Sequence, residues 1–404
     1  MYLTHLSLTD FRNFSRFDLA MPRGVLLMVG DNAQGKTSLL EAVYYLATLS
    51  SFHADSDRQL INFFAADAML AVARIVADFS SAGHSHRVEV RIIQETNGGN
   101  GASRLRKEVL LDGVKHKASD ALGRFIAVLF LPQMLSVIDG SPEERRRYLN
   151  LALSQVFPYY PQALSSYNQA LAQRNALLKL LYERGGDSAQ LDYWDGQLAT
   201  SGAQLVYARI CAVQELERLA VRLHHELTRG GEVLRIKYLP SYDPVASPDQ
   251  YVLPIDTVVD RSGISVEQIR LGFLERLAGL RGDEIERGVT TVGPHRDELR
   301  FLANGIDLGL YGSRGQVRTA ILALKLAEGA WMKERTGNWP VLLLDEVLAE
   351  LDPQRRLDLL SRLSQYEQVM LTTTDLDLFE PEFVRQAEIW HIQSGRLAEA
   401  EHGA

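Results

Sequence analysis

One short stretch, Gly30-Asp-Asn-Ala-Gln-Gly-Lys-Thr37, constrains the fold of this 404-residue chain more than any other. Two glycines separated by four residues precede Lys36 and Thr37, which is the pattern of a phosphate-binding loop. The glycines let the backbone turn so that successive N–H groups point at phosphate oxygens, with the positive end of a helix behind them. Apolar runs at 25–29 and 36–49 have the lengths of the flanking strand and helix. The stretch therefore predicts an α/β fold that binds a nucleotide.

Each residue type in this loop has an expected task. Lys36 would reach the β- and γ-phosphates, and the Thr37 hydroxyl would ligate Mg²⁺. No Asn-Lys-x-Asp segment occurs to select guanine, so ATP is the expected nucleotide. The predicted nucleotide contacts of the loop are Gly30, Asp31, Asn32, Ala33, Gln34, Gly35, Lys36, Thr37 and Ser38.

An acidic strand end supplies the second half of the expected site. The segment VLLLDEV at 341–347 is an apolar run that ends in Asp345 and Glu346. A buried parallel strand delivers such carboxylates to the rim of its sheet. Asp345 would hold Mg²⁺, and Glu346 would orient and deprotonate the attacking water. On its own such a segment is often a plain strand end, but paired with the phosphate loop it predicts ATP hydrolysis.

A third segment opens a helix that runs from about residue 315 to 333. A helix start carries exposed N–H groups and the positive end of the helix dipole. This second anion-binding helix start suggests that a phosphate is held from another side. The predicted nucleotide contacts here are Ser313, Arg314, Gly315 and Gln316.

The net charge of −8 argues at first against a nucleic-acid partner. However, residues 341–404 contain thirteen acids and five arginines, a net of −8, so the preceding residues are neutral overall. Residues 81–150 hold eleven Lys or Arg and eight acids, a local +3. A DNA-binding patch would fit there, although a solvated charged face is an equal alternative for each residue. The predicted DNA contacts are Arg104, Arg106, Lys107, Lys115 and Lys117; of Arg145, Arg146 and Arg147, at most one or two could face DNA.

The N-terminal residues lack the pattern of a secretory signal, and no run of eighteen apolar residues occurs. The single cysteine, Cys211, fits a reducing compartment and is most simply a small apolar filler. We therefore expect a soluble cytoplasmic protein without a membrane partner.

The pattern along the chain changes at Ser141, where a Ser cap, a Pro and acidic residues begin a helical region. Helical patterns continue to about residue 230 without a strict heptad repeat. We therefore predict a mainly helical insertion over 141–284, which divides an α/β domain into 1–140 and 285–404.

The order of phosphate loop, signature helix, acidic strand and the following AELD resembles the ABC-type ATPase heads. The resemblance implies mixed and parallel sheets with flanking helices, and a γ-phosphate that is contacted by the signature Ser and Gly of the opposite subunit. It adds Asp352 to the nucleotide contacts and Gln133 as the glutamine that senses Mg²⁺. The predicted catalytic residues are Lys36, Gln133 and Glu346, and the predicted metal ligands are Thr37, Gln133 and Asp345.

Three positions depart from the broader ABC pattern. Ala33 replaces a frequent loop glycine, which predicts a negative φ at this residue. Arg314 replaces the first glycine of the SGGQ form. No histidine stands at the usual switch position, where either Thr374 or Asp375 would take its place.

A closer resemblance is to the RecF family of bacterial recombination-repair proteins, which is similar to SMC heads without their long coiled coil. It implies an ATP-driven homodimer that binds single-strand gaps and duplex junctions at the nucleoid, with weak DNA-stimulated hydrolysis. It also implies work with RecO and RecR in loading RecA, in DNA replication, recombination and the SOS response. The matching segments are LSLTDFRNF, GDNAQGKTSLLEAVYYLA, GSPEERRRYLN, YNQALAQRNALLK, WDGQLATSG, GPHRDEL and GSRGQVRTAILALKLAE.

Two other functions fit part of these motifs. ATPase subunits of ABC transporters share them, but their two phosphate-site strands usually lie closer in sequence. A scaffold without hydrolysis conflicts with the intact Lys36, Thr37, Asp345 and Glu346. The segment HRDELRFLAN is not a kinase catalytic loop, because Leu302 stands where that loop requires Asn.

Overall fold

The computed structural model describes residues 1–66, 68–96, 103–245, 261 and 263–397. The chain divides into two compact units, residues 1–134 with 325–404 and residues 135–324. In the described part of the chain, no helix combines the length and apolar character that a membrane-spanning segment requires.

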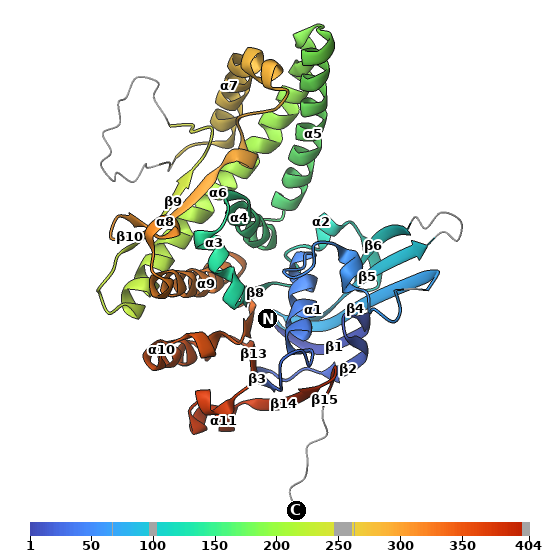
Figure 1. The fold of residues 1–404 in the computed structure, drawn as a ribbon, viewed down its shortest axis with the longest axis vertical. Helices are drawn as coiled ribbons and strands as arrows, with labels where there is room; N and C mark the ends of the chain where they lie inside the picture. The colour runs from blue at the N-terminus through green and yellow to red at the C-terminus, as the bar shows by residue number, and fades with distance from the viewer. Residues whose placement is uncertain (67, 97–102, 246–260, 262, 398–404) are drawn as a thin grey trace, which may run out of the picture. The chain divides into compact units, whose positions relative to one another are not determined.

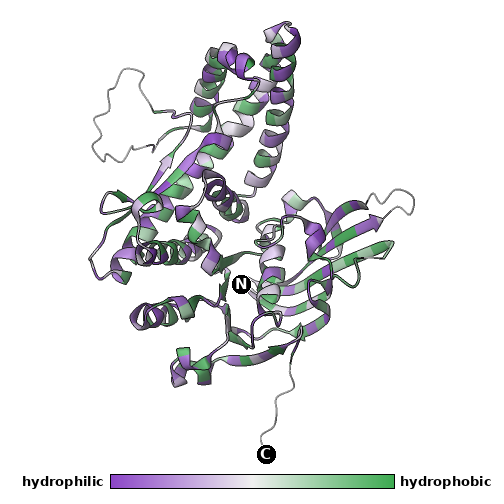
Figure 2. Ribbon diagram, viewed as in Figure 1, coloured by the Kyte–Doolittle hydropathy of each residue, from purple (hydrophilic) through white to green (hydrophobic). Residues whose placement is uncertain are grey.

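The first unit contains an antiparallel sheet with the strand order β2-β1-β4-β5-β6-β7. Its side chains largely alternate between buried and more exposed positions, as the two-residue period of a strand requires. Figure 2 shows the matching alternation of hydrophobic and hydrophilic residues. One face of this sheet therefore belongs to the core. The strands are β1 (Tyr2–Phe11), β2 (Phe14–Ala20), β4 (Leu70–Ser81), β5 (His84–Thr96), β6 (Ser103–Leu111) and β7 (Val114–His116).

A second sheet in this unit has the order β15-β14-β3-β13-β12-β8 and is parallel except for β15. Its central strands are apolar runs that are buried on both faces, as parallel strands usually are. Because these strands run the same way, β3, β12 and β13 end at one edge of the sheet. The strands are β3 (Gly24–Val29), β8 (Ala127–Phe130), β12 (Val341–Asp345), β13 (Gln368–Thr373), β14 (Glu388–Gln393) and β15 (Arg396–Leu397).

Helix α1 (Lys36–Thr48) packs against strands of both sheets. Its apolar side chains are buried around most of its circumference, which is typical of a helix between two layers. The predicted α/β head with mixed and parallel sheets is thus confirmed (Figure 1). The unit also contains α2 (Ala118–Ala121), α10 (Pro353–Leu363), α11 (Pro381–Gln386) and the C-terminal part of α9 (Arg314–Thr336).

The second unit is mainly helical. The predicted cap at Ser141 is present, because its side chain accepts from the Glu144 N–H while the Glu144 carboxylate accepts from the Ser141 N–H. Helices α5, α6 and α7 pack against one another. The helices are α3 (Ser136–Asp139), α4 (Pro142–Val156), α5 (Tyr160–Arg184), α6 (Leu191–Leu227), α7 (Val266–Arg287), α8 (Leu308–Tyr311) and the start of α9.

Two buried arginines join segments of this unit that are distant in the chain. Arg174 on α5 contacts Asp195 on α6 and Glu284 on α7, both at 2.6 Å. Arg209 on α6 contacts Asp297 at 2.8 Å and the Pro294 carbonyl at 2.6 Å. Removing one partner of such a buried pair leaves an unpaired charge, which costs about 3–5 kcal/mol. These contacts therefore make the helical unit sensitive to single charge changes.

A three-stranded sheet completes the second unit in the order β11-β10-β9. Strand β10 (Glu298–Ala303) pairs with β9 (Leu234–Leu239) and with β11 (Ile306–Asp307). We expected the chain to return to the α/β domain at residue 285, but by its contacts the segment up to residue 324 belongs with the helical unit. The pairing of β10 with β9, which lies some sixty residues earlier in the chain, places this segment in the helical unit. No local sequence pattern predicts that pairing.

Candidate nucleotide-binding site

The phosphate loop connects the end of β3 to the start of α1. Gly35 has φ 110°, and a Cβ there would lie 2.6 Å from Asn13 Nδ2. A Cβ at Gly30 would meet the Ile392 carbonyl oxygen even more closely. Gly30 is therefore required by the backbone that lies against it, and Gly35 by its positive φ. The expectation for Ala33 is wrong, because its φ is 65°, a left-handed conformation that the surrounding loop imposes at a cost of roughly 1–2 kcal/mol.

Lys36 is buried and points back into its own loop. Its Nζ donates to the carbonyls of Gly30 at 2.6 Å and Asp31 at 2.9 Å. The Glu346 carboxylate lies 3.5 Å away. The ammonium is thus held inside the loop, in the place from which it can exchange carbonyl oxygens for phosphate oxygens.

Thr37 and Asp345, the predicted metal ligands, are in contact although 308 positions separate them. The Thr37 hydroxyl lies 3.0 Å from both carboxylate oxygens of Asp345. A hydroxyl and a carboxylate are a suitable pair for Mg²⁺, which keeps several waters and binds one or two protein oxygens together with phosphates. Among the described residues, no group of three or more His, Cys, Asp or Glu side chains is arranged to hold a metal ion.

Thr372 is a site residue that the sequence reasoning missed. It pairs with Asp345 in the parallel register of β13 and β12. Its buried hydroxyl donates to Asp345 Oδ1 at 2.6 Å and accepts from the Glu346 N–H at 3.0 Å. Glu346 has φ 52°, so this bond holds an otherwise unfavourable backbone conformation. The only signal in the sequence was a threonine near the end of a second apolar strand.

A cavity of about 950 Å³ adjoins the loop. Residues 32–38 and Glu346 line it, so several predicted site residues share one cavity. Arg12 also lines it and pairs through two hydrogen bonds, 2.7 and 2.8 Å, with the buried carboxylate of Glu41. Further lining residues to which the sequence assigned no role are Asn13, His53, Asn62, Phe63 and Phe64.

The structure does not bring every predicted residue to this cavity. Gln133 is exposed in a 3₁₀ turn (Pro132–Leu135) and is not among the lining residues. Asp352 caps α10, because its Oδ1 accepts from the Arg355 N–H at 3.0 Å, and this bond holds the pKa of Asp352 below its usual value. Thr374 and Asp375, the two switch candidates, are both exposed.

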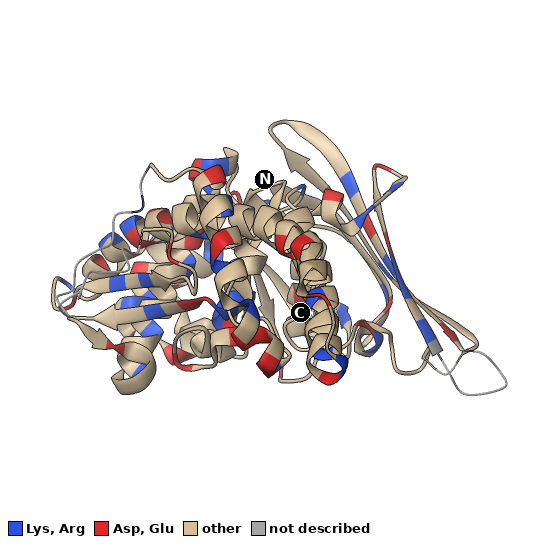
Figure 3. Ribbon diagram, turned by 90° about the horizontal axis from the view of Figure 1, so that it is seen from above, with Lys and Arg blue, Asp and Glu red and all other residues tan. Residues whose placement is uncertain are grey.

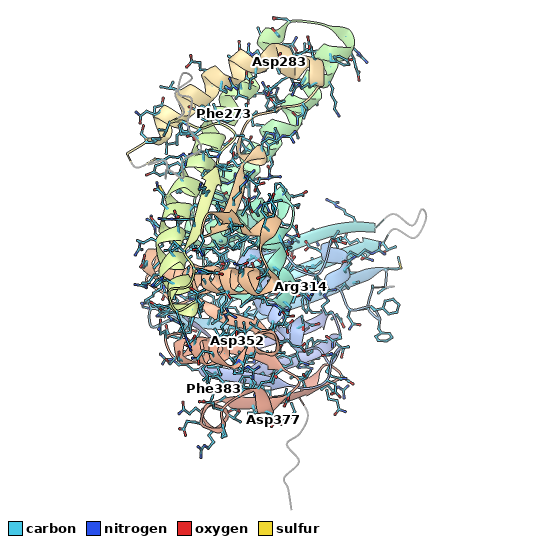
Figure 4. All side chains as sticks on the ribbon, turned by 60° about the vertical axis from the view of Figure 1, so that its left-hand side comes forward. Phe273, Asp283, Arg314, Asp352, Asp377 and Phe383 are labelled. Carbon is cyan, nitrogen blue, oxygen red and sulfur yellow. The ribbon has the colours of Figure 1, made fainter. Side chains whose placement is uncertain are left out.

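The signature segment forms the capped start of α9 in the second unit. The Gln316 N–H donates to Ser313 Oγ at 3.2 Å, and the Ser313 N–H donates to the Gln316 side chain at 3.0 Å. Gln316 also donates to Glu232 at 2.8 Å. Ser313, Arg314 and Gly315 are exposed, and Figure 4 labels the Arg314 side chain at this helix start. The segment is therefore free to meet a ligand from outside.

Most of the predicted DNA contacts are engaged with acids. Lys115 lies 2.7 Å from Glu108, and Arg106 lies 3.3 Å from the same carboxylate. Lys107 contacts Asp57 at 2.9 Å and the Leu49 carbonyl at 2.8 Å, and its ammonium lies over the Tyr45 ring. Figure 3 shows basic and acidic residues interspersed on these strands. Among the described residues, Arg104 and Lys117 are exposed and form no ion pair.

Arg145 and Arg146 also have internal partners. Arg145 pairs with Glu298 at 2.6 Å, and Arg146 donates to the Asp297 carbonyl at 2.9 Å. Both arginines therefore hold α4 to β10 and to Asp297, which directly precedes that strand. That at most one or two of the triplet face DNA stays a prediction.

The chain matches known proteins along almost its whole length. The family model for the RecF/RecN/SMC N terminal domain matches residues 2–394. The DNA replication and repair protein RecF of Chloroflexus aggregans is 41% identical over 98% of this chain and 99% of its own length. The RecF of Roseiflexus castenholzii is 42% identical over the same shares.

Solved structures agree with these relatives. A structure of the recombination mediator protein RecF-ATPrS in the RecFOR pathway has a TM-score of 0.81 at 30% identity, covering 99% of this chain and 98% of its own. A RecF-ATP structure from the same pathway has the same score at 31% identity, covering 98% and 97%. An SMC head, 15% identical over 99% of this chain and 98% of its own, has a TM-score of 0.50 and shares the fold. The fold is that of an SMC-like ATPase head. Within that class, the chain belongs to the RecF family, as the motifs predicted.

Proposed function

We propose that the protein is an ATP-dependent DNA clamp of recombinational repair. Two copies would enclose two ATP molecules, each between the phosphate loop of one copy and the signature segment of the other. The observation that carries the proposal is the convergence of Lys36, Thr37, Asp345 and Glu346 at one sheet edge beside an open cavity. Relatives solved as RecF-ATP and RecF-ATPrS, 31% and 30% identical to this chain, support ATP as the ligand.

Each side chain of this site would have a separate role in ATP binding or hydrolysis. Lys36 would exchange its bonds to the loop carbonyls for bonds to the β- and γ-phosphates. Thr37 and Asp345 would hold Mg²⁺, which when bound neutralises charge on the phosphates. Glu346, partly exposed at the cavity, would orient the attacking water and accept its proton on a carboxylate oxygen. Thr372 would keep both carboxylate residues in position.

DNA is the proposed macromolecular ligand, at single-strand gaps and duplex junctions. Arg104 and Lys117, exposed in the first unit, are the most available of the basic residues expected to contact it. Binding to the phosphate backbone would be largely independent of sequence and would weaken steeply with salt. RecO and RecR are the proposed partners in loading RecA. RecF relatives that match 98% of the chain give no support to a transporter subunit.

Sedimentation with and without ATP and duplex DNA, at two salt concentrations, tests this function. Wild-type protein should dimerise with ATP and be retained on DNA. Ser313→Arg should leave ATP binding by the monomer intact and abolish ATP-dependent dimerisation, because a bulky cation then occupies the signature helix start. Unchanged dimerisation of this variant would contradict the clamp, and association with membranes instead of DNA would favour the transporter alternative.

A further inference from the structure

Two phenylalanines stand on the rim of the nucleotide cavity with their rings in solvent. Phe63 is 78% exposed and Phe64 is 91% exposed, and both line the cavity next to the phosphate loop. Their rings pack edge to face, with centroids 5.8 Å apart. Large aromatic side chains gain most from burial, so an exposed pair beside a ligand site indicates a surface that becomes covered.

The turn that carries these rings is firmly built. Asn62 is buried; its N–H donates to the Asp10 carbonyl at 2.8 Å and its Nδ2 to the Arg12 carbonyl at 2.7 Å. Its Oδ1 accepts from the Phe64 N–H at 3.0 Å, which closes a turn on the side chain. The hydrogen bonds of Asn62 therefore fix the backbone conformation in which both phenylalanine rings are exposed.

A second exposed apolar group directly precedes the signature segment. Leu310 is 71% exposed and Tyr311 is 77% exposed, at the end of α8 and two to three residues before Ser313. Ile306 on β11 is also exposed. Both segments proposed to bind ATP thus have large exposed apolar side chains close to them, beside the cavity for the phosphate loop and in the preceding residues for the signature.

We propose that the Phe63–Phe64 turn of one copy packs against Leu310 and Tyr311 of a second copy when ATP joins the two. The inference rests on the proposed function, since the signature of one copy then approaches the cavity of the other and brings these groups together. The proposed interface would then have ATP phosphates at its centre and this apolar contact at its rim. Such a contact would make dimer stability depend on more than the nucleotide.

A second copy fits this turn better than DNA or a nucleobase does. The segment 61–66 contains no Lys or Arg, and Arg12, which lines the same cavity, is already paired with Glu41, so a polyanion would find little free positive charge beside this turn. Exposed Met69 and Leu70 follow closely in the chain, so the exposed apolar side chains exceed what one base could cover. The two apolar groups also flank complementary halves of one proposed site, which neither alternative explains.

Crosslinking between two single-cysteine proteins tests the contact directly. Cys211→Ser removes the only natural cysteine. Phe64→Cys and Tyr311→Cys are then made in separate chains and mixed with a short bismaleimide, so that only an intermolecular contact between the two positions joins them. We expect a covalent dimer with ATP and little with ADP. Tyr193→Cys, also exposed but on α6, is the matched control for Tyr311→Cys and should not crosslink to Phe64→Cys.

A second variant covers the case in which the cysteines disturb packing. Phe63→Ser combined with Phe64→Ser should raise the dimer dissociation constant at least about tenfold, measured with enough fluorescent ATP analogue to saturate the monomer. Loss of nucleotide binding would identify the turn as a base platform, and loss of DNA retention with intact dimerisation would identify it as a DNA contact; either result overturns the inference. If wild type does not dimerise with ATP, the clamp itself fails; if both proteins dimerise equally, only this contact fails.

Discussion

The Thr372 hydroxyl joins the two acidic residues of the site, because it donates to Asp345 Oδ1 at 2.6 Å and accepts from the Glu346 backbone N–H at 3.0 Å. One buried side chain therefore sets the orientation of the expected metal ligand and the backbone of the expected general base. This orientation depends on β13, because Thr372 lies on that strand whereas Asp345 ends β12.

Thr372→Val should impair Mg²⁺ use more than ATP binding. The loss of a bond that orients a metal ligand typically lowers metal affinity or activity about 10–100-fold. The measurement is the Mg²⁺ concentration for half-maximal ATPase activity, alongside nucleotide binding without Mg²⁺. Thr372→Ser keeps the hydroxyl and should restore activity. Thr373→Val is the matched control, because the hydroxyl of Thr373 bonds to Asp375 instead; an equal Mg²⁺ defect in that variant would argue for general loss of packing.

Glu346→Gln should prolong the ATP-bound dimer. The amide keeps the shape of the side chain but cannot accept a proton from water, so hydrolysis should fall about 10²–10⁴-fold. Sedimentation after addition of ATP should then show dimer that persists much longer than in wild type. Glu350→Gln changes a nearby carboxylate that does not line the cavity and should behave as wild type. Rapid turnover by Glu346→Gln would remove Glu346 from its proposed role.

Ala33→Gly should leave the loop able to bind ATP, whereas Gly35→Ala should disrupt it. Glycine at position 33 relieves a left-handed alanine but adds freedom to the unfolded chain, so the net change in unfolding free energy should lie within about 1 kcal/mol, with ATP still bound. Alanine at position 35 would clash with Asn13 and strain a φ of 110°. ATP binding should then be lost. Urea unfolding and nucleotide titration separate the two outcomes.

His295 should make the protein less stable as the pH falls below neutrality. Burial lowers its pKa to about 4 from the usual 6.5, while Tyr167 and the Thr290 carbonyl bond to its ring. Between pH 6.5 and 4 the unfolded chain binds a proton at this group and the folded chain does not, so stability decreases across this window, by on the order of 3 kcal/mol at its lower end. Urea midpoints against pH should fall less steeply for His295→Gln. Parallel curves would show that other groups cause the acid sensitivity.

Variants of the basic residues should distinguish a structural role from DNA binding. We expect the structural role for Lys107 and DNA binding for Arg104 and Lys117. Lys107→Gln removes contacts to Asp57 and Tyr45 and should lower stability with little change in the salt dependence of DNA binding. Arg104→Gln with Lys117→Gln should instead reduce the slope of log affinity against log salt by about two, one for each lost phosphate contact. An unchanged slope in the double variant would place the DNA surface elsewhere.

Part of the site could be predicted from the sequence because its residues lie close together in the chain. The phosphate loop is one continuous segment whose spacing is set by its own backbone, so Gly30, Gly35, Lys36 and Thr37 were recognisable without a fold. The apolar strand before Asp345 and Glu346 was equally local, and so was the cap at Ser141. The family followed from the order of such segments along the chain.

Relationships between distant residues were decided only by the tertiary structure. The register of β12 and β13 brings Thr372 to Asp345, and the surrounding loop forces Ala33 to a positive φ. The Lys115–Glu108 pair joins neighbouring strands, and the Lys107–Asp57 pair joins β6 to a 3₁₀ turn fifty residues earlier. The exposure of Phe63 and Phe64 depends on a turn that closes on Asn62. A sequence pattern reflects the conformational requirements of residues that are close together in the chain. Which side chains meet across the molecule is set by packing and strand pairing, which act through space.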